Sequence, residues 1–229
     1  MKKIIFFLAL VSISASAQPQ PERSGDLFSS IIKGDKNEVS AFLDNGADPN
    51  SRNGDEVTAL QVASHFGHAA IVELLIERGA KVDMRDRNDR TALLIASAGR
   101  RLDVMEILIK KGADVNVHES GGFTPLMAAS IGKKKEHADA VKLLISSGAS
   151  VNKKSNDGGT ALIKAAAAGN AEIVEILIKN GANPKAEDGR GRTAMDYAVE
   201  KNYSDVIDVL KGGPDRDRPV PAVTPAEKK

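Results

Sequence analysis

Residues 58–83, TALQVASHFGHAAIVELLIERGAKVD, are one copy of a pattern that repeats along the chain and decides its fold. The opening triplet of this stretch returns at steps of 33, 33, 36 and 33 residues. The five triplets are Thr58-Ala59-Leu60, Thr91-Ala92-Leu93, Thr124-Pro125-Leu126, Thr160-Ala161-Leu162 and Thr193-Ala194-Met195. A Gly-Ala pair keeps the same register, at Gly46, Gly79, Gly112, Gly148 and Gly181. Self-similarity at such a step indicates an array of stacked units.

Each unit is predicted to contain two short helices and an extended finger. The Thr of the triplet suits the start of a helix, where its side chain accepts a hydrogen bond from a free backbone N–H. Pro125 suits the first helical turn, which needs no donor. Apolar residues at helical spacing, such as Ile71, Leu74 and Leu75, follow in a second helix. The Gly of the Gly-Ala pair ends that helix, and polar turn residues form the finger.

These markers resemble the ankyrin repeat, whose unit opens on Thr-Pro-Leu-His and ends on Leu-Leu-x-x-Gly-Ala-x-x-Asn. The resemblance implies an all-α repeat solenoid of six stacked units over residues 25–213, each a helix-turn-helix with a β-hairpin-like finger, closed by polar capping units. The predicted units are 25–57, 58–90, 91–123, 124–159, 160–192 and 193–213. The His of the motif is replaced throughout, by Gln61, Leu94, Met127, Ile163 and Asp196. Three extra residues also stand in the fourth unit, near Lys133.

The two ends of the chain have a different character. Residues 1–17 place two lysines before a short apolar run and end on Ala15-Ser16-Ala17, the pattern of a secretory signal peptide. The run is too short to cross a bilayer, so we expect cleavage after Ala17, a linker over 18–24 and a periplasmic protein. Residues 214–229, rich in Pro and charged residues, are expected to form a disordered tail.

The composition excludes several classes of chemistry. Among 229 residues there is no Cys, which excludes disulfides, thiolate metal sites and cysteine nucleophiles. A formal net charge of +1 argues against a nucleic-acid partner. His65 and His68 could share a helical face, but Gly67 stands between them, so a turn is favoured over a metal site. The sequence contains no G-x-S-x-G elbow. We therefore predict no catalytic, metal or cofactor site, and no enzyme.

In ankyrin proteins the fingers and the first helices form a concave groove that receives another protein. Matching positions to that unit yields the candidate partner-binding residues Val57, His65, Phe66, Arg87, Asn88, Arg90, Phe123, Ile131, Arg190 and Arg192. Aromatic and Arg side chains are the common anchors of protein interfaces, which favours Phe66, Phe123 and the arginines. The alternatives are that either Phe folds back onto its neighbouring unit and that the arginines are merely solvated.

The resemblance extends to the short exported ankyrin proteins of bacteria. It implies a non-catalytic scaffold, monomeric when unbound, that docks on another periplasmic protein and regulates it. Self-protection (immunity) proteins that inhibit peptidoglycan endopeptidases, a class of cell-wall hydrolase, are the preferred comparison. The alternative is a protein that binds a cell-envelope polymer or assists in oxidative stress. Sugar polymers are usually bound by stacked aromatic rings, and aromatics make up only 3% of this chain. Neither nucleic-acid binding nor membrane insertion is expected.

Overall fold

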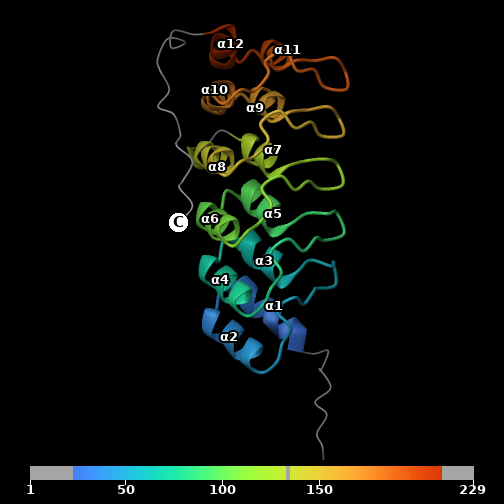
Figure 1. Cartoon of the computed structure of the whole chain (residues 1–229), viewed down its shortest axis with the longest axis vertical. Coiled ribbons are helices and arrows are strands. Elements are labelled where there is room, and N and C mark those ends of the chain that lie inside the picture. Colours follow the sequence, from blue (N-terminus) through green and yellow to red (C-terminus); the bar gives the residue numbers. More distant parts are fainter. Residues whose placement is uncertain (1–22, 133–134, 213–229) are drawn as a thin grey trace, which may run out of the picture.

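The computed structural model describes residues 23–132 and 135–212, which form twelve α-helices in two columns. The helices are α1 (Arg23–Lys33), α2 (Lys36–Asp44), α3 (Ala59–Phe66), α4 (Ala69–Glu77), α5 (Ala92–Gly99), α6 (Leu102–Lys110), α7 (Pro125–Ser130), α8 (Lys135–Ser146), α9 (Ala161–Ala168), α10 (Ala171–Lys179), α11 (Ala194–Glu200) and α12 (Ser204–Lys211). Odd-numbered helices stack on one another, even-numbered helices form the second column, and the fingers project from one side (Figure 1). The predicted all-α repeat solenoid is confirmed.

The helix starts follow from the repeated Thr. In five first helices this residue is the N-cap, and its side chain accepts from the backbone N–H three residues later. These N-caps are Thr58, Thr91, Thr124, Thr160 and Thr193. Pro125 occupies the first turn of α7 as predicted. The Gly of each Gly-Ala pair follows a second helix in the left-handed conformation, with φ of 97° at Gly79 for example, which L-residues with a Cβ avoid.

The core is thin and continuous along the array. Each first helix after α1 has a fully buried alanine at the same register position, so that the neighbouring unit can approach closely. These alanines are Ala63, Ala96, Ala129, Ala165 and Ala198. Aliphatic side chains of the second helices, such as Ile71, Val104 and Leu144, complete one core that runs through all six units. A core of Ala, Leu, Ile and Val explains why aromatic residues are so few.

In the second to fifth units, the position of the missing motif His holds either a polar or an apolar buried side chain. In the second unit Gln61 is fully buried, and its amide nitrogen donates to the carbonyl oxygens of Arg90 and Met84 in the finger region of the same unit. Its amide oxygen accepts from the backbone N–H of Thr58 at 2.8 Å. The three following units place Leu94, Met127 and Ile163 there, all buried. Gln61 therefore ties the first helix of its unit to that unit's finger, and buried apolar side chains stand at the equivalent position in the next three units.

The three-residue insertion lengthens a second helix. Helix α8 has 12 residues, whereas the other second helices have eight or nine, and α7 is shortened to six. Residues 133–134 of the insertion lie outside the described residues. So do the predicted signal peptide, most of the predicted linker and the predicted tail. The first helix begins at Arg23, two residues before the predicted start of the first unit.

Candidate protein-binding face

The fingers and the C-terminal ends of the first helices form what we call the inner face. Three of the five fingers are closed by a side chain at the base that accepts from the backbone N–H groups two and four residues later. Asp86 accepts from Asn88 and Arg90 at 2.9 Å, and Asn53 and Asp188 make the same pair of bonds in their fingers. Asp86 therefore serves as the acceptor that closes the turn of its finger.

Neighbouring finger tips are joined by hydrogen bonds between backbone groups. The N–H of Ser120 donates to the carbonyl oxygen of Asn88 at 3.1 Å, and Asn156 donates to Gly121 at 2.9 Å. Gly189 donates to Asp157 at 2.8 Å, which connects the last pair. The second to fifth fingers are thereby tied into a row. The first finger meets the second through an ion pair of 4.0 Å between Arg87 and Glu56.

Two of the candidate arginines hold their own fingers together. The Arg90 Nε donates at 2.8 Å to Asp86, whose side chain is only 1% exposed. Burial opposes ionisation of Asp86, yet the N–H groups of Arg90 and Asn88 and the Arg90 guanidinium hold the pKa of this carboxyl below its ordinary value. Replacing Arg90 would therefore disturb the finger itself.

Arg192 is engaged in the same way in the last finger. Its guanidinium lies 4.0 Å from the centre of the Tyr197 ring and donates to Glu200 at 3.1 Å. The Tyr197 hydroxyl donates at 2.6 Å to Asp188, and this bond, with those from the finger N–H groups, lowers the pKa of the Asp188 carboxyl to about 2. Arg190, by contrast, is exposed, and its guanidinium has no ion-pair partner among the described residues.

The two candidate phenylalanines differ in their surroundings. Phe123 is half-buried against the core, and Lys164 Nζ of the fifth unit lies 5.5 Å from the centre of its ring, so this side chain packs onto the array and is partly covered. Val57 packs against the core in a similar way. Phe66 remains 40% exposed at the end of α3, between the imidazoles of His65 and His68.

Phe66 belongs to a short row of exposed apolar side chains at the ends of first helices. Ile131, at the end of α7, is 49% exposed, and Ile32, at the matching position of the first unit, is 50% exposed. Sequence reasoning identified Phe66 and Ile131 but missed Ile32, because the first unit lacks the Thr triplet that sets the register elsewhere. Arg87 and Asn88 are exposed on the second finger, and His65 is exposed beside Phe66.

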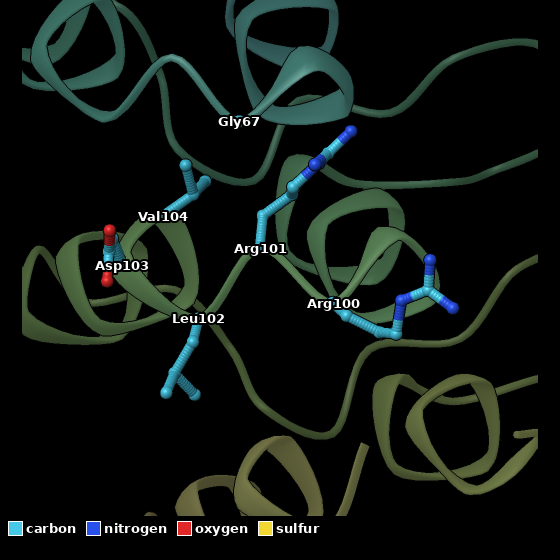
Figure 2. A pocket seen from close by; sticks show the side chains of 6 residues that line it. All are labelled: Gly67, Arg100, Arg101, Leu102, Asp103 and Val104. Atoms are coloured by element: carbon cyan, nitrogen blue, oxygen red, sulfur yellow. The ribbon is translucent and has the colours of Figure 1, made fainter. Parts of the chain in front are cut away.

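A second surface lies where α5 turns into α6. The five arginines between residues 85 and 101 are separated by α5, whose eight residues span about 12 Å. Arg100 and Arg101 consequently stand at the turn, away from the fingers. An open hollow of about 280 Å³ is lined there by Gly67 and the turn residues 100–104 (Figure 2). The sequence carried one signal for it: Arg100 occupies the position that Gly67 and Gly169 hold in other units.

No metal centre is found within the described part of the chain, which contains no group of three His, Asp or Glu residues arranged to hold an ion. The imidazole of His68 stacks on Phe66, with ring centroids 5.9 Å apart, and its Nε2 lies 3.4 Å from the Ile32 carbonyl oxygen. Over residues 23–132 and 135–212, none of the helices combines the length and apolar character that crossing a bilayer requires.

Comparison with known proteins agrees with this architecture. A search of curated proteins gives no significant match. Among solved structures, an ankyrin repeat domain from Acinetobacter baumannii AYE superposes with a TM-score of 0.72 at 29% sequence identity, covering 81% of this chain and 95% of that one. The family model for ankyrin repeats (3 copies) matches residues 27–119 and 126–217. The chain therefore belongs to the ankyrin repeat family, whose repeats imply a protein-binding scaffold and are generally non-catalytic.

Proposed function

We propose that this chain is an exported, non-catalytic scaffold that docks on a periplasmic enzyme through its inner face and inhibits it. The preferred target is a peptidoglycan endopeptidase, with the chain acting as a self-protection protein. The pattern of residues 1–17 supports export. The choice of target is supported by the resemblance to short exported bacterial ankyrin proteins.

The observation that carries the docking proposal is the exposed apolar row. Ile32, Phe66 and Ile131 come from three different units and stand at the same end of their helices. Exposed apolar side chains that gather on one face of a protein mark interaction surfaces. In the intervening third unit the exposed residue near the end of α5 is the small Ala98.

The finger row suits this role because it is rigid before binding. The backbone bonds between the second and fifth fingers fix the tips relative to one another. A preformed surface loses little conformational entropy on association, which favours affinity. The exposed ring of Phe66 is a single large aromatic on this face, whereas a sugar polymer is usually held by several stacked rings. The row therefore favours a protein partner over an envelope polymer.

The test uses the exported chain, residues 18–229, immobilised and exposed to periplasmic extract. A captured cell-wall hydrolase is then purified and assayed on isolated peptidoglycan with and without the chain. We expect its activity to fall. The double variant Phe66→Ala/Ile131→Ala should weaken binding by at least about tenfold, because burying such side chains contributes roughly 1.5–3 kcal/mol each. Its melting temperature should stay close to that of the original chain.

The matched control is Val199→Ala. Val199 is 54% exposed near the end of α11, two units beyond Ile131, so its truncation should leave binding to Phe66 and Ile131 unchanged. Equal binding by the double variant and the original chain would exclude the inner face. Direct sedimentation of the chain with peptidoglycan, without any protein, would favour the polymer-binding alternative. Capture of a peroxide-detoxifying enzyme would favour the oxidative-stress alternative.

A further inference from the structure

We propose that the turn between α5 and α6 is a second recognition site, which binds an acidic segment of a partner protein. We call this surface the turn site and define it as Phe66, Gly67, Arg100, Arg101 and Leu102. It rests on the proposed function only in that the partner is a protein. It adds a carboxylate-binding surface to the apolar row of the inner face.

The first observation concerns the backbone of Arg100. This residue has φ of 57° and ψ of 37°, in the left-handed region, where Gly67 and Gly169 stand in other units. A side chain with a Cβ is strained there, and backbone strain of this kind is concentrated at functional sites. The Arg100 side chain is exposed and has no hydrogen-bond or ion-pair partner among the described residues. It contributes nothing visible to the fold that would offset the strain.

The second observation concerns Arg101, which is held in place without using its whole guanidinium. Its stem lies against Gly67, so closely that a Cβ there would come within 2.8 Å of Arg101 Cδ. Its Nε donates to the carbonyl oxygen of His65 at 3.1 Å. The two terminal nitrogens have no partner within residues 23–132 and 135–212. The side chain is thus oriented in advance, with both terminal N–H groups available to a ligand.

The arrangement of charge around the hollow favours a carboxylate. Figure 2 shows Arg100 and Arg101 extending to one side of the turn, whereas Asp103 lies on the other side. An anionic group beside the two guanidinium groups would therefore not meet the carboxylate of Asp103. A planar guanidinium binds a carboxylate through two parallel N–H bonds, which makes arginine well suited to this recognition.

Apolar atoms next to the arginines point to a peptide segment as the occupant. Leu102 is half-buried at the hollow, and Phe66, 40% exposed, directly precedes Gly67. A segment with Glu or Asp beside an aliphatic side chain would match both features. A polyanion such as an anionic membrane surface would require a longer stripe of cations than two arginines supply.

The test measures binding of a six-residue peptide that alternates glutamate with leucine. It is titrated into the ¹⁵N-labelled exported chain, with the arginine Nε–H signals followed by NMR. The key variant is Arg100→Gly, which restores the residue found at the matching positions of α3 and α9. We expect the dissociation constant of the peptide from this variant to be at least about tenfold higher than from the original chain, because hydrogen bonds between charged groups contribute more than those between neutral groups. Its melting temperature should hold or rise by about 2–4 °C, because strain is relieved.

Two controls separate the turn site from general electrostatic attraction. Arg190→Ala removes an exposed cation from the last finger and should change peptide binding less than twofold. A peptide with glutamine in place of each glutamate should bind at least about tenfold more weakly. Equal binding of either peptide, or of Arg100→Gly and the original chain, would overturn the proposal. Binding to phosphatidylglycerol vesicles without binding to the peptide would overturn it in favour of a membrane surface.

The two proposals can fail independently. If periplasmic capture depends on Phe66 and Ile131 but the peptide does not bind, the inner face stands and the turn site fails. If the peptide binds in an Arg100-dependent manner but no enzyme is captured or inhibited, the turn site stands and the proposed function fails.

Discussion

One seam between units lacks a hydrogen bond that three other seams have, and the substitution Asp83→Asn should restore it. In the complete seams an Asn side chain bridges to the next unit. Asn116 donates from Nδ2 to the Gly148 carbonyl oxygen at 3.1 Å and accepts from the Ser150 N–H at 2.8 Å. Asn50 and Asn152 do the same with their neighbouring units. Asp83, at the equivalent position, can only accept, from the Asp114 N–H at 3.2 Å.

The size of the gain follows from one added bond. A typical intramolecular hydrogen bond contributes about 0.5–1.5 kcal/mol net. Part of this gain is offset, because an amide oxygen is a weaker acceptor than a carboxylate for the Asp114 N–H. Removing the charge of Asp83 also removes its repulsion with the charge of Asp114, which adds to the gain in stability. We therefore expect Asp83→Asn to raise the free energy of unfolding by about 0.5–1 kcal/mol, and the melting temperature by about 1–4 °C.

The assay is urea unfolding of the exported chain followed by far-ultraviolet circular dichroism. Asn116→Asp is the mirror variant, because it removes the donor to Gly148 and should destabilise the chain by a similar amount. An Asp83→Ser substitution removes the charge but supplies no amide group that could bridge to the next unit. It should therefore raise the free energy of unfolding by less than Asp83→Asn does. If Asp83→Asn leaves stability unchanged while Asn116→Asp is also neutral, the Asn bridges contribute nothing to cohesion between units and the reasoning is refuted.

Two further substitutions test backbone strain and the finger network. Glu56 has φ of 62° at the position of Gly122, Gly158 and Gly191, and its ion pairs are long, at 3.9 and 4.0 Å. Glu56→Gly should therefore raise the melting temperature by about 1–4 °C, whereas Glu56→Ala, which keeps the strain, should not. Because the folded-state pKa of Asp188 is lowered from 3.8 to about 2, its stabilising effect should be complete above pH 4 and disappear as the pH falls toward 2. Asp188→Asn should destabilise the chain at pH 7 but make little difference at pH 2, and a constant difference across that range would contradict the assignment.

The repeat period predicted the fold because the chemistry that sets it is local. A Thr before a helix, a Pro in the first turn and a Gly after the last turn each act within a few residues. These signals recur in register, so the helix starts at Thr58 and Thr91 could be placed from sequence. The insertion could not be assigned to a helix in the same way, since it lies between two helices and either could absorb it. The structure places the extra length in α8.

The period also predicted where the candidate residues stand, but not which of them remain available to a partner. Availability depends on the contacts that each side chain makes with other units. Phe123, directly before Thr124, is covered because Lys164 lies over it, whereas Phe66, at the end of α3, stays 40% exposed. One signal could have been recognised: an Asp at the finger base four residues before an Arg occurs twice, at Asp86 and at Asp188. In both fingers the Arg is bound to its own base.

These internal ion pairs explain how recognition can be divided over this surface. In the fingers built on Asp–Arg pairs, Arg90 and Arg192 each form an ion pair with the Asp of their own finger, so their charge is already compensated. Arg100 and Arg101 have no ion-pair partner among the described residues, because α5 separates them from the finger acids. The exposed apolar row and the cationic turn therefore adjoin at Phe66, which belongs to both. A partner contacting both would need an apolar ridge and an acidic segment at matching separation, which is a stricter requirement than either surface imposes alone.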